Sequence, residues 1–192
     1  MTNNKRIYII HGWDGSPKRE WFPWIKKELE SRNYNVTIPE MPHPEEPIIK
    51  DWVDHISKVV GKPNNQTYFI GYSIGCQAIM RYLETVNQQI GGVVFVAGFF
   101  KLTNLESDEE EEVTKPWLET PIDFDKIKKT TDKITAIFSD NDQFVPLASN
   151  KDVLKQKLDT KIVVEHNKGH FDEDSGIFEV PVVLDEILEI IG

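Results

Sequence analysis

Cysteine is almost absent from this chain, and so is any long apolar run. Its 192 residues include a single cysteine, Cys76, so no internal disulfide can form, and a chain without disulfides fits a reducing compartment. Only four apolar residues, 7–10, separate the polar start MTNNKR from His11. That is too few for the core of a signal peptide or for a membrane span. We therefore expect a soluble, cytoplasmic protein.

Basic residues are scarce as well. Lys and Arg together number 22 against 32 Asp and Glu, which gives a formal net charge of −10. Nucleic acids and anionic membranes both attract clustered Lys and Arg, so neither is an expected partner. No spacing of His and carboxylate residues resembles a metal site, and we expect neither a metal nor another cofactor.

Apolar runs and helical spacings alternate along the chain, which favours an α/β fold. Runs that are apolar on both faces predict a mainly parallel sheet with helices on both sides. Strands are expected at residues 7–10, 34–38, 67–70, 91–97, 133–138 and 161–165. Helices are expected at residues 21–29, 48–60, about 148–158 and about 180–191, and a further helical pattern with apolar positions at 78, 79, 82 and 83 follows Gly75. The length suits one domain, residues 1–192.

Residues 98–132 break this alternation. The segment is acidic and carries Pro116, Trp117 and Pro121, and it is predicted to be irregular. An insertion or a short lid is expected there. The run from Asp108 to Glu112 would repel anionic lipid headgroups and is not expected to build an apolar wall.

The stretch from Thr67 to Tyr82, TYFIGYSIGCQAIMRY, carries the strongest functional signal. A short strand runs into Gly71-Tyr72-Ser73-Ile74-Gly75 and then directly into a helical pattern. Gly-x-Ser-x-Gly between a strand and a helix is the nucleophile elbow, in which a strained backbone lifts the serine hydroxyl clear of the sheet. The alternative is a loop serine that lies between two turn glycines.

A nucleophilic serine needs an imidazole base and a carboxylate that orients the base. After Ser73 the chain offers Asp140 or Asp142 in one loop, and then His166 or His170 after the last strand. These positions follow strands of one parallel sheet, so they converge at the carboxyl edge of the sheet. The order nucleophile, acid, histidine is that of the α/β-hydrolase fold.

Motifs along nearly the whole chain resemble one known family. The segments IIHGW, WFPWIKKELE, MPHP, GYSIGC, FVAGF, SDNDQFVP and GHF are similar to those of the small serine hydrolases related to retinoblastoma-binding protein 9, which include bacterial YdeN-type members. The resemblance implies a minimal α/β-hydrolase fold with a six-stranded sheet of order 2-1-3-4-5-6. It also places the active site at the switch point between the first and third strands.

The resemblance also assigns the acid and the base. In SDNDQFVP the catalytic aspartate lies three residues before Val145, which gives the role to Asp142 over Asp140. The segment GHF resembles the family's histidine motif and favours His170, whereas His166 would be a structural histidine. The retinoblastoma-binding Leu-x-Cys-x-Glu motif is missing around Cys76, so binding to the retinoblastoma protein is not expected.

The loop after the first strand is expected to meet the substrate. The resemblance implies that His11, Gly12 and Trp13 form part of the substrate-binding site. It further implies that the backbone N–H groups of Trp13 and Ile74 form the oxyanion hole, which needs no particular side chain.

Together these features predict a serine hydrolase that cleaves small carboxylic esters, thioesters or activated amides through an acyl-Ser73 intermediate. A small pocket would favour acyl groups of about two to six carbons. Two alternatives remain open from the sequence: a protein-interaction module that has kept the fold without catalysis, and an acyltransferase that uses the same triad.

Overall fold

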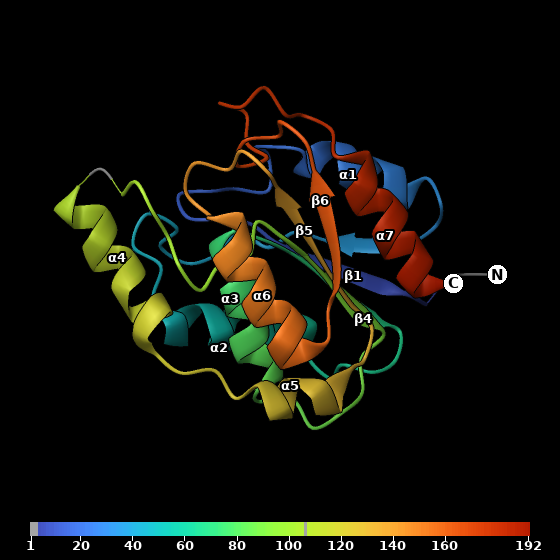
Figure 1. Ribbon diagram of the computed structural model, residues 1–192. Helices are drawn as coiled ribbons and strands as arrows, with labels where there is room; N and C mark the ends of the chain where they lie inside the picture. The colour runs from blue at the N-terminus through green and yellow to red at the C-terminus, as the bar shows by residue number, and fades with distance from the viewer. Residues whose placement is uncertain (1–3, 106) are drawn as a thin grey trace.

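The computed structural model describes residues 4–105 and 107–192 (Figure 1). Its strands are β1 (Arg6–Ile10), β2 (Asn35–Thr37), β3 (Thr67–Tyr72), β4 (Gly92–Val96), β5 (Ile134–Ser139) and β6 (Lys161–Glu165). Its helices are α1 (Phe22–Glu30), α2 (Ile49–Val60), α3 (Ile74–Leu83), α4 (Asp108–Glu119), α5 (Phe124–Thr130), α6 (Leu147–Leu158) and α7 (Pro181–Ile191). None of these helices is both long enough and apolar enough to cross a bilayer.

The six strands form one sheet in the order β2-β1-β3-β4-β5-β6, and every neighbouring pair is parallel. This confirms the predicted fold class and strand order. The strand order reverses at β1, because β2 lies on one side of β1 and β3 lies on the other. At the end of β1, Ile10 pairs with Gly71 of β3. Because the two strands end side by side, the loops that follow them meet at one edge, which is where parallel α/β folds bind ligands.

Two apolar layers cover the sheet, as the alternation within β1 shows. Ile7 and Ile9 face the layer that contains α1 and α7, while Tyr8 and Ile10 face the layer that contains α2, α3, α5 and α6. Figure 1 shows α7 and α1 together on one side of the sheet and α6, α3 and α2 on the other. Helices on both faces are what continuous apolar strands require.

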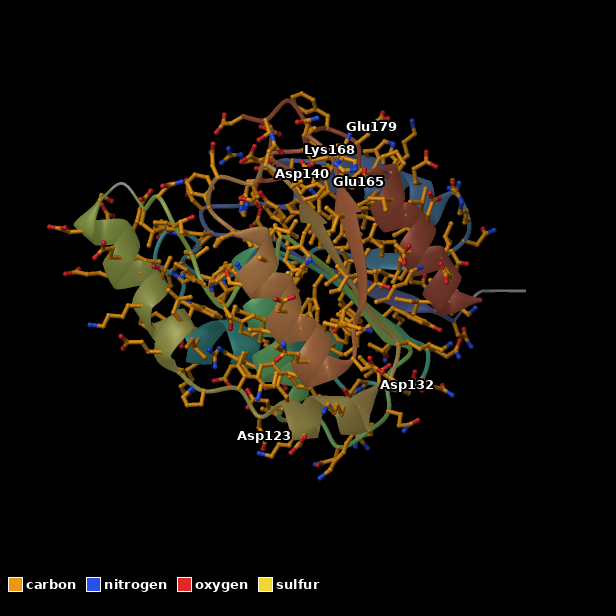
Figure 2. The ribbon with its side chains drawn as sticks, in the orientation of Figure 1. Asp123, Asp132, Asp140, Glu165, Lys168 and Glu179 are labelled. Carbon is orange, nitrogen blue, oxygen red and sulfur yellow. The ribbon has the colours of Figure 1, made fainter. Side chains whose placement is uncertain are left out.

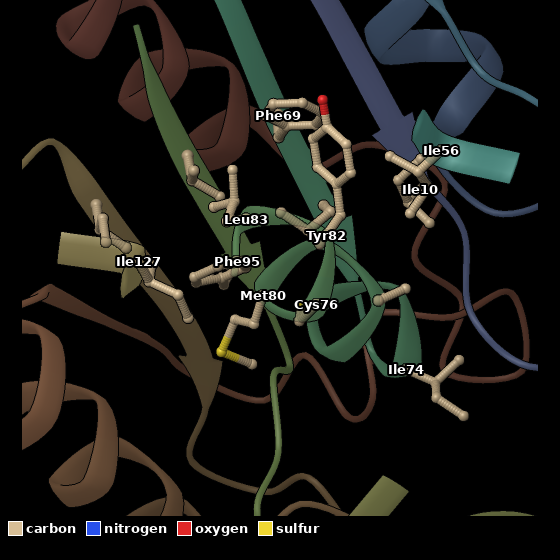
Figure 3. Close-up of a cluster of buried hydrophobic side chains, with 14 of the residues drawn as sticks. Ile10, Ile56, Phe69, Ile74, Cys76, Met80, Tyr82, Leu83, Phe95 and Ile127 are labelled. Atoms are coloured by element: carbon tan, nitrogen blue, oxygen red, sulfur yellow. The ribbon is translucent and has the colours of Figure 1, made fainter. Parts of the chain in front are cut away.

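Helix α3 is the most deeply enclosed of the helices, since all ten of its residues are buried. Figure 3 shows its side chains among those of the neighbouring strands, including Phe69 of β3 and Phe95 of β4. Cys76 is part of this packing, and burial raises the pKa of its thiol. A helix held on every side gives the residue at its start a fixed position.

The segment 98–132 differs from the prediction, because it contains two helices, α4 and α5, rather than irregular chain. The acidic run is the first turn of α4, where negative charge interacts favourably with the helix dipole. The Ser107 hydroxyl accepts a hydrogen bond from the Glu110 amide and caps this turn. In Figure 1, α4 lies farthest from α7, beyond α2.

Candidate active site

Ser73 stands at the sharp turn between β3 and α3 in a strained backbone conformation, with φ of 53° and ψ of −121°. The two glycines of the motif make this turn possible. A Cβ added to Gly75 would lie 2.3 Å from the Ile10 carbonyl oxygen, and one added to Gly71 would lie 2.9 Å from the Cα of Cys76. No side chain fits at either position, so the structure has the geometry of a nucleophile elbow.

The loops after β3, β5 and β6 bring together three predicted residues. The Ser73 Oγ lies 3.0 Å from His170 Nε2, and His170 Nδ1 lies 2.8 Å from Asp142 Oδ2. The second oxygen of Asp142 accepts from the amides of Phe144 and Val145, at 2.9 and 3.0 Å. Because the carboxylate accepts from Nδ1–H, Nε2 is left as the acceptor for the serine proton.

The other two candidates, Asp140 and His166, form a second pair outside this arrangement. His166 Nδ1 lies 2.6 Å from Asp140 Oδ2, and the His166 side chain is 79% exposed. This hydrogen bond raises the pKa of His166, while bonds from the Asn167 amide and from His166 lower the pKa of Asp140. Neither residue lines the cavity that contains Ser73.

The loop after β1 brings only two of its three predicted substrate-binding residues to the cavity. Gly12 and Trp13 line the cavity beside Ser73, as expected of substrate-binding residues. His11 does not, because its side chain is completely buried. Its Nε2 accepts from the Met41 amide at 3.1 Å and its Nδ1 donates to the Gly12 carbonyl at 2.8 Å. The prediction that His11 contacts substrate is therefore corrected: this histidine holds the loop in place.

The amides of Trp13 and Ile74 meet no hydrogen-bond acceptor within the described ranges. Ile74 is the first residue of α3, where backbone N–H groups have no partner within the helix. Both residues line the cavity beside Ser73. The two N–H groups are thus available to a ligand.

A cavity of about 280 Å³ surrounds the Ser73 hydroxyl. Its walls combine apolar and charged side chains: Phe22, Phe99, Leu102, Leu105 and Phe144, together with Asp14, Arg19, Glu20, Glu110, Asp172 and Asp174. Phe99, Leu102 and Leu105 belong to the segment 98–132, so this segment contributes apolar side chains to the cavity. The apolar residues come before the acidic run and not from it.

Comparison with known proteins now decides the family. The sequence profile of the family described as "Serine hydrolase" matches residues 7–188. The chain belongs to this serine hydrolase family. As expected from the sequence, it is similar to the YdeN hydrolase of Bacillus subtilis, with 36% identity over 184 residues that cover 94% of this chain and 93% of YdeN.

Further comparisons agree with this assignment. The crystal structure of the ydeN gene product from B. subtilis superposes with a TM-score of 0.88 at 34% identity, covering 97% of this chain and 98% of that one. The serine hydrolase RBBP9 of Rattus norvegicus is 26% identical over 174 residues, 89% of each chain. A carboxylesterase structure from Nitrososphaera gargenis, with a TM-score of 0.74, 14% identity and coverage of 100% and 92%, shares the fold.

Two aromatic residues of this serine hydrolase were given no role by the sequence. The Tyr72 hydroxyl donates to the His170 carbonyl at 2.9 Å, and burial raises the pKa of Tyr72 well above its ordinary value. The Phe144 ring meets the His170 ring edge-on at 5.5 Å between centroids. Both aromatics lie inside recognised motifs, but their contact with a distant histidine cannot be read from local sequence.

The described residues include no group of three or more His, Cys, Asp or Glu side chains that could hold a metal ion. The expectation that the chain needs neither a metal nor another cofactor stays a prediction.

Proposed function

We propose that this serine hydrolase cleaves small carboxylic esters, and related thioesters or activated amides, through an acyl-Ser73 intermediate. The observation that carries the proposal is the unbroken hydrogen-bonded chain from Ser73 Oγ through His170 to Asp142, which opens into the 280 Å³ cavity. A serine hydroxyl, an imidazole and a buried carboxylate in this geometry act as nucleophile, general base and orienting group.

In the first half-reaction Ser73 Oγ attacks the carbonyl carbon of the ester while His170 Nε2 takes its proton. The carbonyl oxygen becomes an oxyanion, and we assign its stabilisation to the amides of Trp13 and Ile74, each contributing about 3 kcal/mol. Collapse of this intermediate breaks the bond to the alcohol, which leaves with the proton from His170. Water then repeats the sequence on acyl-Ser73, so the acid is released and Ser73 is regenerated.

The volume of the cavity favours a small substrate. Its volume of about 280 Å³ lies just below the roughly 300–1,000 Å³ that ligand pockets usually enclose, which suits an acyl group of about two to six carbons. Five carboxylate residues line it together with Arg19. This excess of negative charge disfavours anionic substrates and anionic lipid surfaces.

The experiment that tests the proposal measures turnover of p-nitrophenyl acetate and butyrate by the wild type and by Ser73→Ala. We expect the variant to fold normally and to lose turnover, because the hydroxyl carries the chemistry. Ser57→Ala, which alters an exposed serine on α2, is the matched control and should match the wild type. A folded Ser73→Ala protein with substantial turnover would refute the proposal.

A further inference from the structure

The acid loop and the histidine loop are joined by hydrogen bonds that lie outside the triad. The side chains of residues 139–141 accept from the three backbone amides that immediately precede His170. The pairs are Ser139 Oγ with the Lys168 amide at 3.0 Å, Asp140 Oδ1 with the Asn167 amide at 2.9 Å, and Asn141 Oδ1 with the Gly169 amide at 2.9 Å. Four consecutive side chains, 139–142, therefore contact four consecutive residues, 167–170.

The side chains of residues 139–141 are anchored in the sheet through Ser139. Ser139 is the last residue of β5 and is almost completely buried. Its hydroxyl donates to Asn141 Oδ1 at 2.7 Å, so that one amide oxygen accepts from both Ser139 and Gly169. The two bonds fix the orientation of the Asn141 side chain. Figure 2 shows Asp140 and Lys168 at the same end of the sheet as Glu165, the last residue of β6.

The histidine loop needs such support, because it has little regular structure of its own. Asn167, Gly169 and Phe171 all have positive φ, of 56°, 53° and 60°. A residue other than glycine in this region costs about 1 kcal/mol or more. At His170 the loop is held by the Tyr72 hydroxyl, and after it by the completely buried Phe171. Before His170 the side chains of residues 139–141 supply the acceptors for the loop amides.

We propose that Ser139, Asp140 and Asn141 are positioning residues that set the place of the His170 imidazole between Ser73 and Asp142. Asn141 is expected to have the largest effect on the position of His170, because its Oδ1 accepts from the amide of Gly169, the residue immediately before His170. The inference rests on the proposed function, since it concerns the same reaction. A misplacement of about 1 Å at a catalytic group lowers the rate by up to about 100-fold. The loss of one of these hydrogen bonds therefore has a measurable effect on catalysis.

The test compares three variants of the full chain on p-nitrophenyl butyrate. Asn141→Ala removes the acceptor, and we expect kcat to fall about 10- to 100-fold with KM within about twofold of the wild type. Asn141→Asp keeps an oxygen acceptor at this exposed position, and we expect it to restore most of kcat. Gln143→Ala is the matched control, because Gln143 is an exposed amide in the same loop, and we expect no change.

A spectroscopic measurement separates positioning from a general loss of stability. Proton NMR of the folded variants follows the resonance of the His170 Nδ1 proton, identified by its loss in Asp142→Asn. We expect this resonance to weaken or shift in Asn141→Ala and to persist in Asn141→Asp and Gln143→Ala.

Wild-type kcat and an unchanged resonance in folded Asn141→Ala would overturn the inference, as would a loss confined to KM or a failure of Asn141→Asp to restore kcat. If Asn141→Ala does not fold, Asp140→Ala and Asp140→Asn make the same comparison at the hydrogen bond between Asp140 and the Asn167 amide. Equal kcat in those two variants overturns the inference. A wild type that turns over no ester, or a Ser73→Ala variant that still does, would instead refute the proposed function.

Discussion

At the scale of residues, the two aspartate–histidine pairs differ in burial. The side chain of Asp142 is 2% exposed and that of His170 is 12% exposed, whereas those of Asp140 and His166 are 35% and 79% exposed. A hydrogen bond shielded from water orients an imidazole more firmly than one in solvent. Only the buried pair reaches the Ser73 hydroxyl.

We therefore predict that Asp142→Asn and His170→Ala each lower kcat by about four orders of magnitude, as expected for members of a triad that act as a unit. Asp140→Asn and His166→Ala are predicted to cost far less, because an asparagine in place of Asp140 would still offer an oxygen to the Asn167 amide. The measurement is kcat of the four variants on one activated ester. A greater loss at Asp140 or His166 would transfer the catalytic roles to that pair.

The exposed pair has a predictable pH dependence. The pKa of His166 is raised above its ordinary 6.5, so its contribution to stability is complete below 6.5 and is lost as the pH rises through the folded pKa. The pKa of Asp140 is lowered below 3.8, so its contribution is present above 3.8 and is lost as the pH falls through the folded pKa. The pair thus stabilises the fold most between these two ordinary values.

Thermal denaturation of the wild type and His166→Ala tests this dependence. The difference in Tm should be larger at about pH 5.5 than at about pH 8.5, and small at both because the pair is exposed to water. An equal difference at the two pH values would show that the Asp140 contact does not titrate as described.

At the scale of elements, α4 is fixed to the body of the protein through its carboxyl end. The guanidinium of Arg81, on α3, donates to the backbone carbonyls of Trp117 and Thr120 at 2.9 Å each. Arg81 is 4% exposed, and its bond to Trp117 is buried while its bond to Thr120 is partly buried. The indole of Trp117 in turn donates to the Pro47 carbonyl at 2.9 Å. These contacts hold the helix whose Glu110 and Thr114 line the cavity.

Replacing Arg81 with Met keeps an unbranched apolar side chain in place of the arginine stem and removes the donors. We predict that Arg81→Met lowers the free energy of unfolding by about 2–3 kcal/mol, because the buried Trp117 carbonyl and the partly buried Thr120 carbonyl lose their donor. Arg32→Met, at an exposed pair with Glu28, is the control and should cost less than about 1 kcal/mol. Urea denaturation measures both. Equal losses would mean that Arg81 does not anchor α4.

The elements differ in how far the sequence could predict them. The strands and the elbow were predicted because their signals are local: apolar runs, and a glycine on either side of Ser73. Helix α4 was missed because only Thr114 and Trp117 are buried among its twelve residues, so its apolar stripe is too short to recognise. The role of His11 was also missed, since its partner Met41 lies thirty residues away and only the folded chain brings them together.

At the scale of the whole molecule, the cavity relates the fold to substrate size. Helix α4 and the chain before it form one wall, and the loops after β1, β3, β5 and β6 contribute most of the others. An enclosure of about 280 Å³ has room for a short acyl chain and lacks the extended apolar surface that a long one requires.

A chain-length series of p-nitrophenyl esters tests this relation. We predict that kcat/KM is highest for acyl groups of about two to six carbons and falls for longer ones. A maximum at long acyl chains, or activation by a lipid interface, would show that the segment 98–132 opens as a lipase lid.

The central claim is that Ser73 is the nucleophile, and a fluorophosphonate probe tests it most directly because it reacts with an activated serine. Labelled protein is digested, and the modified peptide is located by mass spectrometry. We predict one adduct, on Ser73, and no labelling of folded Ser73→Ala protein. An adduct on another residue, or labelling that persists in the Ser73→Ala variant, would contradict the account.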